Sequence, residues 1–362
     1  MSTETIIDNI IDPKEIKAKW EQLLQEKPGT RIKDAADLLQ LSEAELLATT
    51  ISENCIRLEG DWAELLKRLK SLGKVMSLTR NDHCVLENKG TFQKINIMGE
   101  GERQMATVIG PIETRVFFKA WHVAFAVKQP KKDRWLESIQ VFDKQGVAIT
   151  KIYLQDKSNR EAYQQLIQDF TSSDQSFAQQ VFPAEPTQYK EDIDSEAFLS
   201  EWAGLKDTHD FFGMLRKYEV HRQKAIHLAE SKFSFPIAIS AIQDVLEQSA
   251  SMKLPIMIFA GNSGNIQIHQ GKVRTIKLLG PNERMTDSWL NIMDPEFNMH
   301  LRLNEINEAW IVHKPTEDGT VSSIELFDKK GELTAQFFGL RKPGISQKAE
   351  WAELLETIPV LQ

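Results

Sequence analysis

Two kinds of hydrophobic pattern alternate along the chain, and the whole alternation occurs twice. Each copy opens with apolar residues at helical spacing, over residues 33–49 in the first copy and after Trp202 in the second. Within the first of these segments, Ser42 and Glu45 have the spacing of a capping box, which predicts a helix start. Each copy ends in an amphipathic helical pattern, which covers residues 347–358 in the second copy.

Between these helices lie short segments with apolar residues at every second position, typical of half-buried strands. The predicted strands are 94–99, 116–127, 138–144 and 148–154 in the first copy, and 256–261, 266–269, 275–280, 306–314, 323–329 and 333–340 in the second. Strands in succession, without regular alternation with helices, predict antiparallel sheets with helices at the ends or on one face.

Sequence identity between the copies indicates a tandem duplication. Residues 138–146 and 323–331 are identical at six of nine positions, at an offset of 185 residues. At an offset of 181, a second set of residues is repeated: Met76, Asn81, Gly90, Gly99, Glu102 and Arg103 recur as Met257, Asn262, Gly271, Gly280, Glu283 and Arg284.

The predicted fold is therefore α+β, a pseudo-dimer in which each half is a large antiparallel sheet with flanking helices. We expect the repeats at residues 12–170 and 195–362, joined by a polar, proline-containing linker or linker helix at 171–194. A duplicated domain leaves a cleft between its halves, where a ligand commonly binds.

Composition narrows the function classes. Of 362 residues, 44 are Lys or Arg and 52 are Asp or Glu, so the net charge of −8 argues against a nonspecific nucleic-acid binder. No apolar run is long enough to span a bilayer, and no signal peptide is expected at the N-terminus. Two cysteines, Cys55 and Cys84, form no disulfide framework, which suits a cytoplasmic protein.

The familiar catalytic motifs are absent. The sequence contains no phosphate-binding loop, dinucleotide fingerprint or nucleophile elbow, and its eight histidines lack zinc-ligand spacing. The candidate positions are instead those at which the two copies differ.

His209 and Arg115 are two such positions. Asp207 or Thr208 is a plausible N-cap of a helix, which would place His209 in the first turn as a neutral ring available to a metal. The corresponding region of the first copy has no histidine, and the counterpart of Arg115 is His300. Arg115 lies beside aromatic residues that suit a planar ligand. Judged from local sequence alone, an exposed cap histidine and a surface arginine are the favoured interpretations of these two residues.

A third candidate set consists of cationic and polar residues in the second copy. Cations on separate elements clamp carboxylates, although such residues are also common on any protein surface. The set comprises Arg222, Lys314, Gln336 and Arg341.

Several long segments, in order, resemble one family. They are LTRNDHCVLE, FFKAWHVAFAV, DTHDFFGMLRK, WLNIMDPEFNMHLR, EAWIVHKPTEDG and FFGLRKPG. They resemble the cytoplasmic haem-utilisation proteins of the HemS/ChuS type, also called haemin-degrading or haemin-transport factors. The resemblance covers residues 13–355 and implies two repeats with haem b in the cleft between them.

The resemblance also implies roles for individual residues. The family's axial histidine matches His209, its distal arginine matches Arg115 with Phe117 nearby, and the aromatic that packs on the macrocycle matches Phe259. The residues that hold the propionates match Arg222, Lys314, Gln336 and Arg341. The last segment often contains a tyrosine in this family; here Phe338 lacks the hydroxyl that would bind a propionate.

This residue set suits a flat apolar disc with two carboxylates, because it supplies aromatic faces, one axial nitrogen and cations. His83 and Cys84 form a weaker alternative ligand pair, a secondary or transient site. Position 83 also differs between the copies, because Gly264 occupies the corresponding place.

Two functions fit the resemblance. The first is a cytoplasmic carrier that accepts imported haem and traffics, stores or helps degrade it for iron acquisition. The alternative is an enzyme that opens the tetrapyrrole and releases iron, in which Arg115 would be catalytic and electrons would come from outside. A purely structural protein is disfavoured by the motifs. Candidate partners are an inner-membrane haem importer, a haem oxygenase or a reductase, and we expect a monomer or weak dimer.

Overall fold

The structure, a computed structural model, describes residues 12–131, 134–281, 287–341 and 346–361. The repeat positions Glu283 and Arg284 lie outside these ranges. The chain forms two compact units. Unit 1 contains the described residues up to Arg80 together with 87–185 and 262–267, and unit 2 contains 81–86, 186–261 and the described residues from 268 onward.

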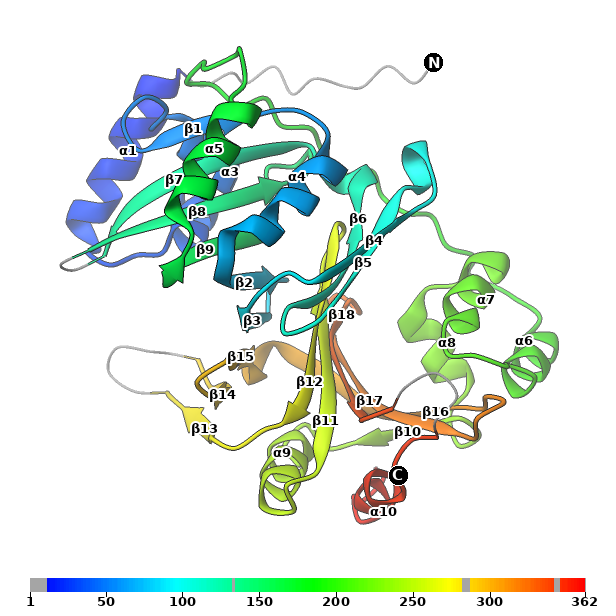
Figure 1. Cartoon of the computed structure of the whole chain (residues 1–362). Coiled ribbons are helices and arrows are strands. Elements are labelled where there is room, and N and C mark those ends of the chain that lie inside the picture. The colour runs from blue at the N-terminus through cyan, green and yellow to red at the C-terminus, as the bar shows by residue number, and fades with distance from the viewer. Residues whose placement is uncertain (1–11, 132–133, 282–286, 342–345, 362) are drawn as a thin grey trace. The chain divides into compact units, whose positions relative to one another are not determined.

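The first half of the chain begins with helices, continues with strands and ends in a helix (Figure 1). Its helices are α1 (Pro13–Glu26), α2 (Ile32–Leu39), α3 (Glu43–Ala48), α4 (Trp62–Arg68) and α5 (Arg160–Phe170), with short 3-10 turns η1 (Leu69–Leu72), η2 (Gly101–Arg103) and η3 (Phe118–Ala120). Its strands are β1 (Cys55–Leu58), β2 (Gly73–Arg80), β3 (Cys84–Gly90), β4 (Lys94–Met98), β5 (Met105–Ile109), β6 (Glu113–Phe117), β7 (Val123–Lys131), β8 (Arg134–Phe142) and β9 (Ala148–Ser158).

The second half repeats this order. Its helices are α6 (Ser195–Ala203), α7 (Asp210–Tyr218), α8 (Arg222–Leu228), α9 (Ala241–Ser251) and α10 (Ala349–Glu356), with the 3-10 turn η4 (Leu303–Glu305). Its strands are β10 (Ser234–Ile237), β11 (Pro255–Gly261), β12 (Asn265–Lys272), β13 (Ile276–Leu279), β14 (Trp289–Met293), β15 (Phe297–Arg302), β16 (Ile306–Lys314), β17 (Val321–Asp328) and β18 (Leu333–Gly339).

The strands form two nine-stranded antiparallel sheets whose orders confirm the duplication. One runs β1-β7-β8-β9-β2-β3-β15-β14-β13, and the other β10-β16-β17-β18-β11-β12-β6-β5-β4. The first five strands of one sheet correspond one to one with the first five of the other. The predicted α+β fold with two antiparallel halves is confirmed.

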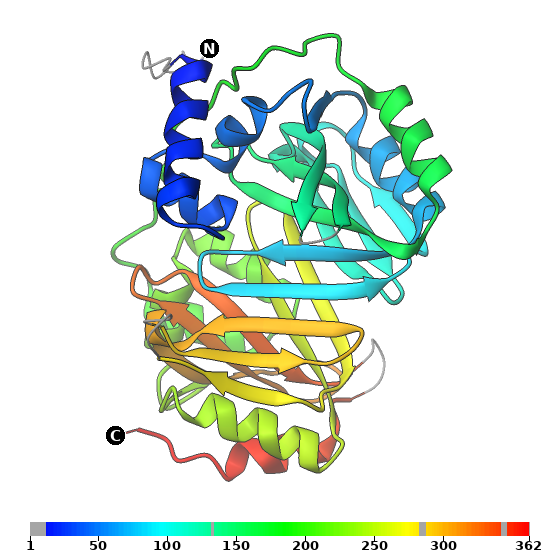
Figure 2. The ribbon, with the colours of Figure 1, turned by 90° about the vertical axis from the view of Figure 1, so that its left-hand side faces the viewer.

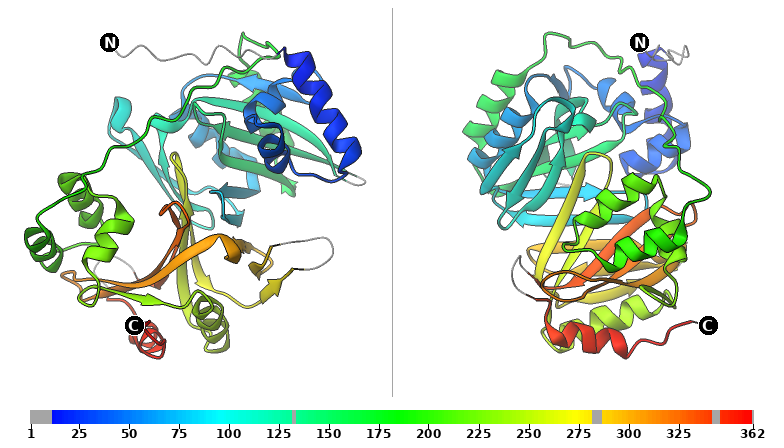
Figure 3. Two further views of the ribbon diagram at one scale, coloured as in Figure 1. Left: turned by 180° about the vertical axis from the view of Figure 1, so that it is seen from behind. Right: turned by 90° about the vertical axis from the view of Figure 1, so that its right-hand side faces the viewer.

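Helices cover both faces of the β16-β17-β18-β11 region in unit 2. Figure 2 shows α9 and α10 along one side of the unit, and Figure 3 shows α6, α7 and α8 grouped together. Ile311 of β16 and Ile324 of β17 pack with α9 and α10, whereas Trp310 and Phe327 pack with α6–α8. Neighbouring residues of a strand point to opposite faces, so each side of the sheet has its own apolar cluster.

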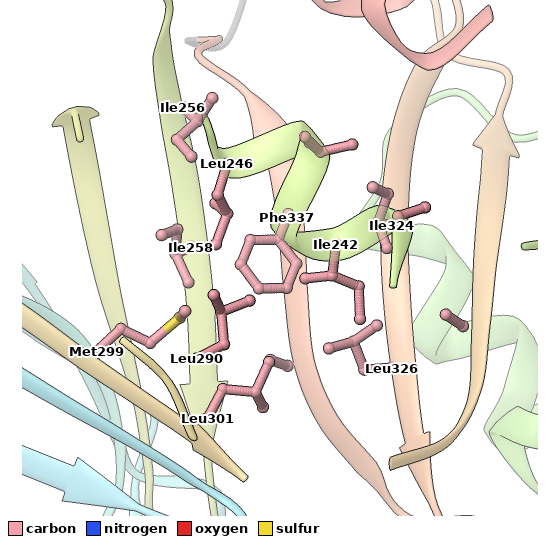
Figure 4. Packing of buried hydrophobic residues seen from close by; sticks show 14 of the residues in the cluster. Ile242, Leu246, Ile256, Ile258, Leu290, Met299, Leu301, Ile324, Leu326 and Phe337 are labelled. Carbon is pink, nitrogen blue, oxygen red and sulfur yellow. The ribbon is translucent and has the colours of Figure 1, made fainter. Parts of the chain in front are cut away.

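A large apolar cluster lies beneath α9 and α10 (Figure 4). Ile242 and Leu246 of α9 lie against Phe337 of β18, and Ile258 and Met299 complete the packing around them. These side chains are at most 1% exposed, so burial of their surface contributes the hydrophobic stabilisation of this face. The buried ion pair of these strands, Lys314 with Glu325, lies on the opposite face.

One predicted strand differs from the structure. The expected strand at 116–127 is interrupted, because β6 ends at Phe117 and η3 precedes β7. In unit 1, the indole Nε1 of Trp121 donates to the carbonyl of Gly264 at 3.3 Å, and it is this turn that brings the indole to the carbonyl. For residues 171–194 the sequence left a linker or a linker helix open, and the structure has no helix there; Thr171 forms an isolated β-bridge with Leu58. The Arg57 guanidinium fixes the first part of this linker by donating to the carbonyls of Ser176 and Ala178.

One repeated asparagine organises a hairpin turn in each unit. In unit 1, the Nδ2 of Asn262 donates to the carbonyls of Arg80 (2.8 Å) and Ile149 (2.9 Å). Its Oδ1 accepts from the backbone N–H groups of Gly264 and Asn265, both at 3.1 Å. In unit 2, Asn81 has the equivalent role. The repeat of this residue at an offset of 181 therefore has a structural cause.

We expect Asn262→Ala to lower the free energy of unfolding by about 1–3 kcal/mol, because carbonyl and N–H groups of the turn lose their partners. Urea titration followed by circular dichroism measures the change. Asn262→Asp is the matched control: it keeps the acceptor for Gly264 and Asn265 and loses the donor, so its cost should be smaller. Equal stability of Asn262→Ala and the wild type would contradict this role.

Candidate functional site

A row of four side chains crosses one face of the sheet in unit 2. Trp310 pairs with Glu325, Glu325 with Gln336, and Gln336 with Phe259 on four adjacent strands, β16, β17, β18 and β11. Cross-strand partners point to the same face. Because Trp310 packs with α6–α8, the whole row lies on that side of the sheet. By the same alternation, Lys314 shares this face.

Glu325 is the centre of this row. It is fully buried, and its carboxylate accepts hydrogen bonds from Ser323 of its own strand and from three side chains of other elements. Arg222 donates from Nε at 2.7 Å and from Nη2 at 2.9 Å, Lys314 donates from Nζ at 2.6 Å, and Gln336 donates from Nε2 at 3.0 Å. A buried carboxylate needs such partners, since isolated burial of a charge is very costly.

The same two cations pack against one aromatic ring of α7. The Arg222 guanidinium lies 5.1 Å and the Lys314 ammonium 4.8 Å from the ring centroid of Phe211. Phe211 is buried and also meets the ring of Trp202 at 4.5 Å. Cations over an aromatic face are attracted to it. The charge cluster thus holds the first turn of α7 in place.

Burial and charge act in opposite directions on this cluster. Burial alone would raise the pKa of Glu325, but the adjacent Arg222 and Lys314 hold that pKa far below its usual value. Burial lowers the pKa of Lys314, and the neighbouring Glu325 carboxylate opposes that change. The carboxylate is therefore ionised in neutral solution.

The equivalent positions of unit 1 contain different charges. Arg222 is the first residue of α8, and Glu43 is the first residue of α3. At an offset of 185, the counterparts of Lys314, Glu325 and Gln336 are Gln129, Gln140 and Lys151. In unit 1, Lys151 pairs with Glu43 and the formal charges of the four positions cancel. In unit 2 the four positions carry one positive charge in excess, which favours an anionic ligand.

His209 lies just before the helix that Phe211 anchors. α7 begins at Asp210, so His209 occupies the N-cap position and the predicted helix start was too early. Its ring Nδ1 lies 2.5 Å from the Asp207 Oδ1, which also accepts from the backbone N–H of His209 at 2.8 Å. The imidazole is 85% exposed. The ring is thus oriented by a carboxylate and open to a ligand.

Arg341 and two phenylalanines complete the candidate residues of unit 2. The Arg341 Nη1 is buried and has no hydrogen-bond partner among the described residues. Its charge nevertheless acts on Asp207, whose pKa is lowered chiefly by the hydrogen bond from the backbone of His209. Phe259 and Phe338 meet edge to face at 5.1 Å. Unit 2 therefore contains an aromatic pair, a cation cluster and an exposed imidazole.

Arg115 and Phe117 belong to unit 1. Both lie on β6, where Arg115 is opposite Thr107 and Phe117 is opposite Met105. The Arg115 Nη2 lies 3.3 Å from the Glu113 carboxylate, and its Nη1 donates to the carbonyl of Thr114 at 3.3 Å. The Arg115 side chain is partly exposed. The cleft between the halves stays a prediction.

The alternative pair, His83 and Cys84, has different surroundings in unit 2. The Nε2 of His83 lies 3.5 Å from Asp328, and its Nδ1 is buried without a hydrogen-bond partner among the described residues. Cys84 is fully buried, and burial raises the pKa of its thiol to about 12. A thiol binds metal as the thiolate, so burial disfavours Cys84 as a ligand.

Sequence reasoning missed Glu325 and the role of Phe211. Glu325 lies within SIELFDK, where a charge among strand residues was visible, and the first copy has Gln140 in its place. A carboxylate that appears in only one copy of a buried strand was the available signal.

The described residues contain no helix that is long and apolar enough to cross a membrane. Nor do they contain a group of three or more His, Cys, Asp or Glu side chains that could hold a bare metal ion.

Comparison with known proteins gives consistent matches over both repeats. The haemin-degrading HemS/ChuX domain matches residues 40–170 and again 219–358. The haemin transport protein HemS of Yersinia enterocolitica is 31% identical over 342 residues, which are 93% of this chain and 96% of that protein.

Two solved structures match almost the whole chain. The haem-bound form of PhuS, a haem-binding protein from Pseudomonas aeruginosa, is 39% identical with a TM-score of 0.91, and the match covers 97% of this chain and 100% of that one. ChuS, described as an E. coli haem oxygenase, is 30% identical with a TM-score of 0.84, and the match covers 95% and 99%.

We expect Glu325→Gln to lower the free energy of unfolding by about 3–5 kcal/mol at neutral pH, because Arg222 and Lys314 lose their buried counter-ion. Chemical denaturation measures the change. The exposed Glu317→Gln serves as the control and should cost less than about 0.5 kcal/mol.

We expect the difference in unfolding free energy between the wild type and Glu325→Gln to depend on pH. A carboxyl whose pKa is depressed by folding stabilises the protein fully above its unfolded pKa, and this stabilisation is lost as the pH falls below that value. The stability difference between wild type and Glu325→Gln should therefore be constant above about pH 5 and shrink below it. A difference that is independent of pH down to acid unfolding would contradict the ionised carboxylate.

Proposed function

Because this chain belongs to the haemin-degrading HemS/ChuX family, as its motifs predicted, we propose that it binds haem through unit 2 and carries it for iron acquisition. The observation that carries the proposal is the combination of an exposed, carboxylate-oriented imidazole with an excess of buried positive charge. In the proposed role, the protein accepts imported haem and traffics it, stores it or helps to degrade it in the cytoplasm.

The residues of unit 2 fit the chemistry of haem. Haem supplies an iron that takes an axial nitrogen, an apolar macrocycle and two carboxylates. His209 is the proposed axial ligand, because its Nε2 is open while Nδ1 faces Asp207. Arg341 offers a buried Nη1 donor that has no partner among the described residues, the kind of group that a carboxylate would satisfy.

The other proposed contacts follow the same chemistry. Arg222, Lys314 and Gln336 would hold propionates, assisted by the positive charge that Glu325 leaves uncompensated. Phe259 would pack on the macrocycle, next to Phe338. Phe338 has no hydroxyl group, so this position contributes packing without a hydrogen bond to a propionate.

Arg115 of unit 1 is the proposed distal arginine. Arg115 is held by a carboxylate and a carbonyl and remains partly exposed, with Phe117 two residues further along the strand. In a carrier, this arginine would help to keep haem enclosed. The proposed partners are an inner-membrane importer that delivers haem and an oxygenase or reductase that receives it.

The alternative is haem degradation by this chain itself. It is supported by the description of ChuS, which is 30% identical, as a haem oxygenase. Arg115 would then be the catalytic candidate, because a guanidinium stabilises developing negative charge. The two functions are distinguished by what happens to bound haem when electrons are supplied.

We expect purified protein to bind one haemin per chain, and His209→Ala to weaken that binding by more than about tenfold. Loss of a group that merely supports a metal ligand costs about 10–100-fold, and loss of the ligand should cost at least as much. Titration followed at the Soret band measures affinity and spectrum together. His227→Ala, which removes another exposed histidine of unit 2, is the control and should leave both unchanged. An unchanged spectrum in His209→Ala would exclude His209 as the axial ligand.

The carrier is expected to keep its Soret band when ascorbate, or NADPH with a reductase, is added in the presence of catalase. Loss of the band with release of iron despite catalase would establish the enzyme. In that case Arg115→Ala should slow the loss while haem still binds. Loss of the band only without catalase would indicate oxidation by free peroxide, which leaves the carrier in place.

A further inference from the structure

Asp207 forms a closed hydrogen-bonded unit with His209. One carboxylate oxygen, Oδ1, accepts both from the backbone N–H of His209 at 2.8 Å and from its ring Nδ1 at 2.5 Å. The two residues are separated by only one position in the chain. The contact therefore fixes the imidazole with little loss of conformational entropy beyond that of the loop itself.

This contact determines which ring nitrogen is available. An ionised carboxylate only accepts hydrogen bonds, so Nδ1 carries the proton and Nε2 presents its lone pair. The exposed side of the ring is therefore the metal-binding side.

The pair contributes little to folding. The His209 and Asp207 side chains are 85% and 47% exposed, and ion pairs in contact with water have a small effect on stability. A ligand that covers the imidazole would exclude that water and strengthen the effect of the carboxylate on the ring. The hydrogen bond between Asp207 and His209 is therefore expected to matter more for a bound ligand than for the stability of the fold.

The neighbouring carboxylate of Asp210 accepts from the backbone of the turn and not from the imidazole. Its Oδ2 accepts from the backbone N–H of Asp207 at 3.0 Å, and the backbone N–H of Asp210 donates to the carbonyl of Asp207 at 3.1 Å. No hydrogen bond joins Asp210 to the His209 ring among the contacts of this described loop. Two carboxylates lie in one turn, and a single one orients the imidazole.

We propose that Asp207 is a positioning residue for the axial ligand: by accepting from Nδ1 it makes His209 a stronger electron donor and so favours ferric over ferrous haem. The inference rests on the proposed function. A carboxylate behind a histidine ligand fixes its tautomer and raises its basicity, and a more basic ligand stabilises the higher oxidation state. Asp207 would thereby hold haem in its oxidised form.

The test uses full-length protein loaded with haemin and three variants. Asp207→Ala removes the acceptor, Asp207→Asn keeps an acceptor without charge, and Asp210→Asn is the matched control that removes the other carboxylate of the turn. The midpoint potential of the haem is measured by reductive titration with indicator dyes. The iron–histidine stretching frequency of the reduced protein is measured by resonance Raman spectroscopy.

We expect Asp207→Ala to lose about tenfold of the preference for ferric over ferrous haem, which corresponds to a potential about 59 mV higher for a one-electron couple. The iron–histidine frequency should fall in the same variant. Asp207→Asn should lie between Asp207→Ala and wild type, and Asp210→Asn should equal the wild type in both measurements.

Other outcomes would overturn the inference. A wild-type potential and frequency in Asp207→Ala would show that the carboxylate does not act on the ligand. An equal shift in Asp210→Asn would show that general negative charge, and not the hydrogen bond to Nδ1, is responsible. If wild-type haem binding does not depend on His209, the proposed function itself fails, and the titration of His209→Ala identifies that case separately.

Discussion

The burial of one carboxylate, that of Glu325, constrains the whole of the candidate site in unit 2. A charge without exposed surface must be compensated within the protein, and here Arg222 and Lys314 compensate it from different elements. Both cations also lie against Phe211, which fixes the first turn of α7 and with it the position of His209. A single ionic centre thus determines where the charges and the imidazole of the site lie.

Because the chain is duplicated, the charges of unit 2 can be compared with those at the equivalent positions of unit 1. Both units use the same sheet positions for a buried polar layer, but unit 1 contains one matched ion pair, Lys151 with Glu43, whereas unit 2 contains two cations around Glu325. A matched pair needs no further partner. An excess cation would be stabilised by an anionic ligand, so a change of a few residues after duplication explains why the proposed propionate contacts lie in unit 2.

Much of this could be predicted from the sequence. Period-two patterning and the two repeated blocks gave the strands and the duplicated fold, and the capping box of Ser42 and Glu45 occurs as expected. The predicted start of α7 was too early. The Asp207 carboxylate accepts from the backbone N–H of His209 in the loop before the helix, and the helix itself begins at Asp210. Glu325 was missed, since pairing between strands, and not local sequence, brings its partners together.

We propose that unit 2 recognises the carboxylates of haem through its excess positive charge. The most direct measurement compares the affinity of the wild type for haemin and for haemin dimethyl ester, whose carboxylates are neutral. We expect the ester to bind at least about tenfold more weakly, since hydrogen bonds between charged groups contribute about 1.5–3 kcal/mol each. Equal affinities would contradict it and would leave the macrocycle and the axial ligand as the sole source of binding.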